Sequence, residues 1–171
     1  MNQKCKILIA VMVVVISLAG YYGYQQYNLS NMQGYLQTSL THKNAANDYL
    51  NKASAYENKN DYTNAILMYQ KGSNEISKAL KNDNNALVLS NDVYKNYIGN
   101  DILLLQTTSK LIEFQIYLNH EKNNDLNPGQ ERVNPTNLAP HINQLKNEIS
   151  VYKDNENKII AANPDKFKFL N

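Results

Sequence analysis

The sequence predicts an all-α protein, in which an N-terminal apolar helix precedes an up-and-down antiparallel bundle of three or four long helices. Three observations lead to this prediction. Apolar residues recur at intervals of three and four, the period of one helix face. No run of six or more residues alternates as a half-buried strand requires. Only six glycines occur, and none forms an Asn-Gly or Asp-Gly hairpin turn.

Composition limits the classes of protein to which the chain can belong. Its 171 residues, 43% of them apolar, suffice for one domain with a modest core. The formal net charge is +2 and the basic residues are spread along the chain, so we expect no nucleic-acid partner. The single cysteine, Cys5, excludes an intramolecular disulfide and any cysteine-based metal cluster.

The chain opens with an apolar segment that carries no charge. Residues 7–24 follow a short basic tail, residues 1–6, which contains Lys4 and Lys6. Eighteen helical residues extend about 27 Å, close to the roughly 30 Å hydrocarbon core of a bilayer. We therefore expect a transmembrane or signal-anchor helix over residues 7–24, bound to membrane lipid. The residues on which this membrane-anchor prediction rests are Lys4, Lys6, Ile7, Val15, Tyr21, Tyr22 and Tyr24.

The flanks of this segment predict its orientation. The tyrosine rings at its end favour the headgroup layer, and the next charge after Lys6 is Lys43. The positive-inside rule then predicts a single-pass protein of the cell membrane, with a cytoplasmic N-terminus and the bulk of the chain outside. An alternative stays open, because Ser17-Leu18-Ala19 before Gly20 also fits a signal-peptide cleavage site near Ala19. The rest of the chain would then be secreted.

Residues 28–163 carry the predicted bundle. A first helix is expected over 29–58, with a weak polar middle over 38–44, and Asn60 or Asp61 is expected to cap the second helix. The stripe from Tyr62 to Leu80 forms that helix, with Gly72 where a neighbouring backbone can approach closely. We expect the next turn at residues 82–85.

The second half of the bundle is expected to contain one long element and one shorter helix. Apolar residues over 86–118 cover more than one face, and Gly99-Asn100-Asp101 predicts a kink or a restart. Residues 119–137 read as a polar loop. The last helix is expected from Thr136 or Asn137 to Asn163-Pro164, followed by a C-terminal tail over 164–171.

One part of the chain resembles a known family of helical hairpins. Residues 45–81 include Ala53 and Tyr56, the polar turn ending in Asp61-Tyr62, and then Ala65-Ile66 and Tyr69. This pattern is similar to a single hairpin of tetratricopeptide repeats and to the related hairpin of MIT domains. The resemblance implies two antiparallel helices packed through small residues and tyrosines.

A broader likeness is to extracytoplasmic four-helix sensor domains of chemoreceptors and histidine kinases, which also begin with a basic tail and a spanning helix. No second apolar segment follows the bundle in this sequence. This likeness therefore implies a ligand-binding domain that works with a separate output protein.

No catalytic, metal or cofactor motif is present, and we expect a non-enzymatic protein without cofactors. His42, His120 and His141 lack a second ligand at helical spacing and read as surface residues. Five carboxylates could be brought together if their helices converge, but we expect them to lie on solvent-exposed helix faces. They are Asp48, Glu75, Asp92, Asp101 and Glu113. A cluster of carboxylates in a cleft with strongly perturbed acidity would instead favour an exported enzyme.

Two functional expectations follow. The first is a membrane-anchored, exported bundle that acts as an interaction or structural module at the cell envelope, with a protein partner of unknown identity. The alternative is the sensor-like ligand-binding bundle. A buried polar pocket between helices would favour that alternative.

Overall fold

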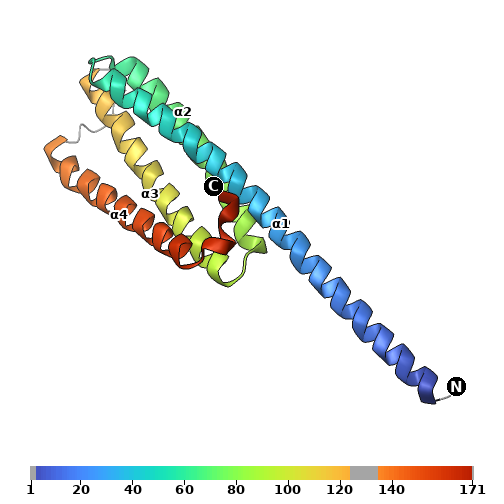
Figure 1. Ribbon diagram of the computed structural model, residues 1–171. Coiled ribbons are helices and arrows are strands. Elements are labelled where there is room, and N and C mark those ends of the chain that lie inside the picture. The colour runs from blue at the N-terminus through green and yellow to red at the C-terminus, as the bar shows by residue number, and fades with distance from the viewer. Residues whose placement is uncertain (1–2, 124–134, 171) are drawn as a thin grey trace.

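The computed structural model describes the backbone of residues 3–123 and 135–170 and the side chains of residues 12–123 and 138–170. Over these residues the chain is helical and contains no strand. The elements are α1 (Gln3–Glu57), α2 (Tyr62–Leu89), α3 (Asp92–Lys122), α4 (Pro135–Ala162) and two 3₁₀ turns, η1 (Pro164–Lys166) and η2 (Lys168–Leu170). Each α-helix packs on the next along the chain (Figure 1), so the predicted all-α class and helical bundle are confirmed.

α1 runs without a break for 55 residues, where the sequence predicted an anchor and a separate first helix. The two join because the chain contains no proline before residue 128, so nothing removes a backbone donor within α1. The N-terminal part of α1 projects beyond the other helices (Figure 1). Leu29 is its most N-terminal residue in contact with the bundle core. We call residues 12–27 the stem.

The stem contains only part of the predicted anchor. Val15, Tyr21, Tyr22 and Tyr24 are described and exposed, whereas Lys4, Lys6 and Ile7 lie outside the described side chains. Across the side chains that are described, no helix has a stretch both long and apolar enough to cross a lipid bilayer.

The predicted turn between the first two helices is confirmed. α1 ends at Glu57, and Asn60 adopts φ 58°, a left-handed conformation that asparagine tolerates. Asp61 is the N-cap of α2, because its Oδ1 accepts a hydrogen bond from the Asn64 backbone N–H at 3.2 Å. Farther along α2, a Cβ added to Gly72 would lie 3.6 Å from the Ala46 carbonyl oxygen. The close approach predicted there is also confirmed.

The turn predicted at residues 82–85 is wrong. α2 continues to Leu89, and the chain reverses at residues 90 and 91 instead. The asparagines support the helix here, since Asn82 and Asn84 donate to the carbonyl oxygens of Lys78 and Leu80 at 2.9 and 2.7 Å. Asp83 lies on the buried face.

The break predicted at Gly99-Asn100-Asp101 is also wrong, because α3 is continuous from Asp92 to Lys122. The two residues after Gly99 are held by contacts with other helices. Asn100 donates to the Tyr152 carbonyl oxygen of α4 at 2.7 Å, and Asp101 is buried beside Lys43 of α1. Tertiary contacts therefore override the poor helix propensity of these residues.

Residues 164–170, assigned from the sequence to a C-terminal tail, fold back on the bundle. Phe167 is only 2% exposed, and its ring lies 4.9 Å from that of Tyr97 and 5.4 Å from that of Tyr94. Tyr94 Oη donates to the Lys166 carbonyl oxygen at 2.9 Å. This segment therefore contributes to the core.

The core consists of two apolar clusters along the bundle. One lies near the stem and contains Met32, Leu36, Ala86, Tyr94, Tyr97, Ile98 and Phe167. The other lies near the α1–α2 turn and contains Ala46, Ala53, Ala65, Tyr69, Ile76, Ala79, Leu105 and Ile112. Between these positions in α1, α2 and α3 are polar residues that are buried or, for Lys43, half-buried. With Glu156 of α4 they form what we call the polar layer: Ser39, Lys43, Asp83, Asp101 and Glu156.

Candidate functional site

The polar layer receives a side chain from each of the four α-helices. Lys43 of α1 donates from Nζ to Asp101 Oδ2 of α3 at 2.5 Å. Asp83 of α2 is fully buried, and Asp101 is 1% exposed. Glu156 of α4 interacts electrostatically with both aspartates. Three carboxyl groups therefore share one cation, an arrangement that is costly in a core unless protons or hydrogen bonds compensate it.

Several oxygens of this layer accept no hydrogen bond. They are both carboxyl oxygens of Asp83, Oδ1 of Asp101 and Oε1 of Glu156. The hydroxyl of Ser39 lies near Asp83 and lowers its pKa, but it donates to the Ala79 carbonyl oxygen at 3.3 Å. A buried acceptor without a donor costs about 1–3 kcal/mol, so these oxygens call for a physical explanation.

The surroundings change the acidity of these groups. Burial, followed by the charge of Asp101, raises the pKa of Asp83 to about 7. The same two causes raise the pKa of Glu156 to about 8. Burial by itself would lower the pKa of Lys43, but the charge of Asp101 and the hydrogen bond to it outweigh burial and raise that pKa. Asp83 and Glu156 are therefore carboxyl groups that hold a proton near neutral pH.

Sequence reasoning missed Asp83 and Glu156, although a signal for them exists. Asp83 follows Ala79 by four residues and precedes Ala86 by three, and both alanines are fully buried. Glu156 stands four residues after Tyr152 and three before Ile159 on the predicted stripe of the last helix. A carboxyl residue at a stripe position of a helix predicts a buried charge.

Of the five carboxylates considered from the sequence, only Asp101 joins this layer. Asp48, Asp92 and Glu113 are exposed, as expected for solvated faces. Glu75 instead pairs with Lys78 and with His42, whose Nδ1 lies 2.6 Å from Glu75 Oε2. His42, expected at the surface, is half-buried and contacts Glu75. His141 is exposed and His120 is half-buried.

A second, smaller polar contact lies near the α1–α2 turn. Glu57 at the end of α1 accepts from Tyr69 Oη at 3.0 Å and from Nδ2 of the fully buried Asn119. Burial and the charge of Glu57 raise the pKa of Tyr69, so the phenol keeps its proton and donates. This contact ties α1, α2 and α3 together at the end of the bundle away from the stem.

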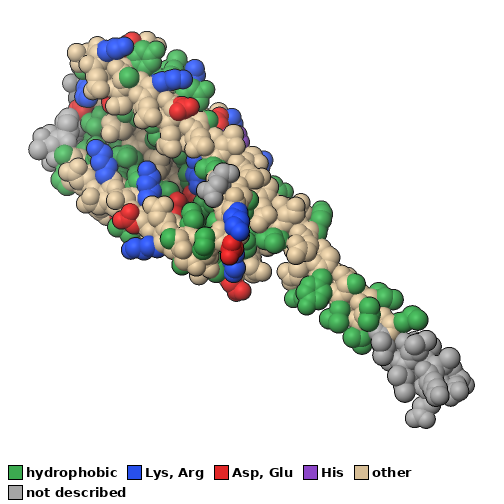
Figure 2. Space-filling model, viewed as in Figure 1, with side chains coloured by type: hydrophobic (Ala, Val, Ile, Leu, Met, Phe, Trp, Pro, Cys, Tyr) green, Lys and Arg blue, Asp and Glu red, His purple; other side chains and the backbone are tan. Residues whose placement is uncertain are grey.

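α1 and α4 leave an open seam along one side of the bundle. The seam holds a cavity of about 220 Å³ whose floor includes Leu104, Leu105 and Leu111, with Lys43 and Lys153 at its edge. Figure 2 shows this side of the molecule hollowed, with hydrophobic side chains inside and lysines beside them. The arrangement can accept a small apolar molecule with an anionic group.

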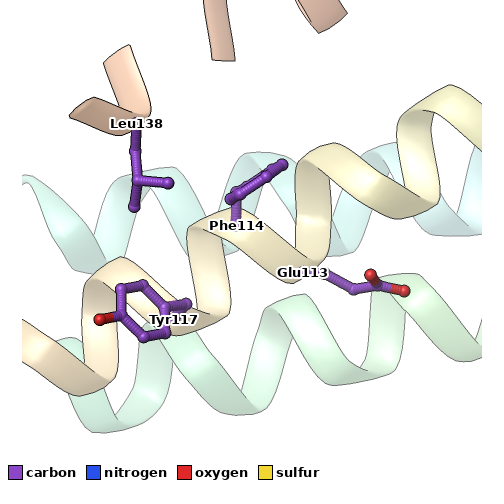
Figure 3. A pocket seen from close by; sticks show the side chains of 4 residues that line it. All are labelled: Glu113, Phe114, Tyr117 and Leu138. Carbon is purple, nitrogen blue, oxygen red and sulfur yellow. The ribbon is translucent and has the colours of Figure 1, made fainter. Parts of the chain in front are cut away.

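A second cavity, of about 240 Å³, lies between α3 and α4 at the end away from the stem. It is lined by Glu113, Phe114, Tyr117 and Leu138. Phe114 and Leu138 extend into the space between the two helices, whereas Glu113 leaves α3 on another side (Figure 3). Residues 124–137, which precede Leu138, lie outside the described side chains. We therefore assign no ligand to this cavity.

The stem is the other unusual surface. Its large apolar residues, among them Val15, Ile16 and Tyr22, are 52–70% exposed. Successive helical residues turn by about 100°, so the four residues 13–16 point in four directions around the axis. The stem is thus apolar on every side and is not an amphipathic face.

Among the side chains that the structure describes, no group of three or more histidine, cysteine, aspartate or glutamate residues is arranged to hold a metal ion. Lys43 already supplies a cation to the carboxylates of the polar layer. No family model, curated protein or solved structure matches this chain.

Proposed function

We propose that this chain is a single-pass membrane protein whose helical bundle acts outside the cell membrane as a non-catalytic interaction or structural module. The observation that carries the proposal is the stem, where α1 exposes apolar side chains on every side. A helix that is apolar all round is stable only when it is surrounded by protein core or by lipid. No other described element covers the stem (Figure 1).

The distribution of the stem residues favours lipid over a protein partner. A partner helix covers one face and requires an apolar stripe, as α2 offers to α1 and α3. The stem has no such preference, because Met12, Val13, Val14, Val15 and Ile16 are all more than half exposed. Residues 7–11 continue the same composition in the sequence.

The tyrosines of the stem support a headgroup position at its end. Tyr21, Tyr22, Tyr24 and Tyr27 point in four directions around the helix axis within about 9 Å of its length. Each ring is 59–66% exposed. Tyrosine rings that surround one short stretch of a helix are suited to a membrane interface, where each ring can place its hydroxyl in the headgroup layer.

The lysines of the N-terminal tail supply the orientation. Lys4 and Lys6 precede the apolar segment, and the positive-inside rule keeps them in the cytoplasm. The bundle then lies outside, immediately after Tyr27. Cleavage near Ala19 remains the alternative, and the mature protein would then begin near Gly20 and be secreted.

Two measurements test anchoring and orientation. In spheroplasts, a tag placed after Asn171 should be digested by external protease, and protection of that tag would contradict the proposal. The variant Val13→Lys/Val15→Lys should be released from membranes by alkaline carbonate, because each lysine costs about 2.5–3.5 kcal/mol in a bilayer centre.

A matched variant controls for the added charge. Val88→Lys/Val151→Lys places the same two lysines at positions of the bundle that are 84% and 54% exposed. This protein should remain in the membrane fraction. The mass of the mature N-terminus distinguishes the alternatives, because a chain that starts at Gly20 would support secretion and contradict the anchor.

The seam between α1 and α4 favours the second candidate, a sensor-like bundle that binds a small ligand and acts with a separate output protein. Its leucine floor and lysine edge suit a saturated carboxylate. Binding of octanoate should raise the Tm of the full chain more than acetate does, and Lys153→Ala should reduce the difference. Equal Tm values with both carboxylates would contradict this candidate.

A further inference from the structure

The side chains around the polar layer leave several of its carboxyl oxygens without a hydrogen-bond donor. On α1, Lys43 donates to Asp101 and Ser39 donates to the Ala79 carbonyl oxygen. Yet Asp83 and Glu156 each lie close enough to Asp101 for a hydrogen bond between carboxyl groups. Such a bond needs one proton per pair. Protons on Asp83 and Glu156 supply it and leave Asp101 ionised beside Lys43.

We propose that the polar layer is a proton-binding lock, in which Asp83 and Glu156 each hold one proton and donate it to Asp101, and in which loss of these protons loosens α4 from the other helices. In the closed state the layer is electrically neutral, with Lys43 and Asp101 as its one ion pair. When both protons leave to solvent, three negative charges face one lysine in a buried place.

The groups that face the layer come from every element packed around it. α1 provides Lys43 and the hydroxyl of Ser39, α2 provides Asp83, α3 provides Asp101 and Tyr97, and α4 provides Glu156. The charges of Asp101, Glu156 and Asp83, added to burial, raise the pKa of Tyr97, so its phenol stays neutral. Lys153 lies at the edge of the seam with Lys43.

We expect α4 to be the helix that loosens when the two protons are lost. It packs on α3 and has no extensive contact with α1 or α2. Of its described side chains only Leu138 and Ile142 are buried. Near the layer it is held by polar contacts: Glu156, the hydrogen bond from Asn100 to the Tyr152 carbonyl oxygen, and a long contact of 3.5 Å between Asn155 and Asn100. Ile159 and Ile160, which are only partly buried, pack on the core cluster near the stem. The aspartates, in contrast, lie within the well-packed α1–α3 unit.

The pKa values of Asp83 and Glu156 agree with this proposal and define the pH range over which the two protons are lost. Asp83 and Glu156 have ordinary pKa values of 3.8 and 4.5, which the fold raises to about 7 and about 8. Between these limits the folded protein binds more protons than the unfolded chain, so stability falls as pH rises. The contribution of these two groups to stability is fully present below about pH 4 and is lost once the pH passes about 8.

Thermal unfolding of the full chain in detergent micelles tests the lock. The Tm should fall by more than about 10 °C between pH 5 and pH 8.5. Asp83→Asn and Glu156→Gln, which mimic the protonated groups, should each remove a large part of this fall. The controls Asp48→Asn and Asp154→Asn change exposed carboxylates on α1 and α4 and should keep the wild-type slope.

A second measurement uses only the wild-type protein, so it tests the proposal even if a variant fails to fold. The side-chain carboxyl ¹³C shifts of the wild-type protein should show Asp83 and Glu156 titrating between pH 6 and 9, together with faster amide exchange in α4 at the upper end. Titration of both groups near pH 4 would overturn the proposal. So would a wild-type pH dependence in both Asp83→Asn and Glu156→Gln.

Discussion

The stem and the polar layer depart from ordinary packing in opposite directions. In the stem, valines, an isoleucine and tyrosines are exposed, whereas in the layer two carboxyl groups are buried and a third carboxyl group and a lysine are half-buried. Both lie on α1, and the stem ends 16 residues before Lys43. On our two proposals, each region depends on something that the folded chain does not supply by itself: lipid for the stem and protons for the layer.

The largest expected effect comes from removing the cation of the layer. Lys43→Met keeps the length of the side chain but leaves Asp101 without its ion pair. Loss of one partner of a buried pair costs about 3–5 kcal/mol. The loss in unfolding free energy, measured by denaturant titration, should be greater at pH 8 than at pH 5, because protonation relieves the unpaired carboxylates.

The next largest effect should come from the apolar cluster beside the layer. Phe167→Ala removes a ring that packs on Tyr94 and Tyr97, and we expect a loss of about 3–4 kcal/mol. In contrast to Lys43→Met, this loss should be the same at pH 5 and pH 8. A pH-dependent loss would show that the cluster and the layer are not separate units.

A smaller effect is expected at the link between α3 and α4. Asn100→Ala removes the hydrogen bond to the Tyr152 carbonyl oxygen, at a cost of about 1 kcal/mol. Amide exchange should accelerate in α4 and stay unchanged in α2. Faster exchange throughout the bundle would mean that α4 does not open by itself.

The smallest effect on stability belongs to the stem. Val15→Ser should change the unfolding free energy of the bundle by less than about 0.5 kcal/mol, because no other element contacts that side chain. Its effect should appear in membrane partitioning instead. A large loss of bundle stability would show that the stem packs against protein.

The sequence predicts the helical class and the α1–α2 hairpin well, because local signals determine them. Asp61 caps α2 through its own neighbour Asn64, and Gly72 lies where Ala46 approaches. The errors came where tertiary contacts override propensity. The burial of Asp83 and Ala86 continues α2 through the predicted turn, and the contact of Asp101 with Lys43 supports an unbroken α3.

The candidate site was harder to predict because it depends on alignment between helices. Asp101 was considered from the sequence as one of five carboxylates, but the two carboxyl residues that join it are 18 residues before it and 55 residues after it in the chain. No local sequence pattern predicts how the helices align along the bundle, and this alignment is what places Asp83 and Glu156 beside Asp101. Only the stripe positions of these two residues indicate that their side chains are buried.

The unbroken course of α1 has a mechanical consequence. With no bend from the stem to Glu57, the helix is a single rod that extends from the apolar segment to the carboxyl cluster. A tilt or rotation of the rod in its surroundings must move Lys43 together with the tyrosines. The bundle therefore has no swivel at its base, and its inclination is the inclination of that one helix.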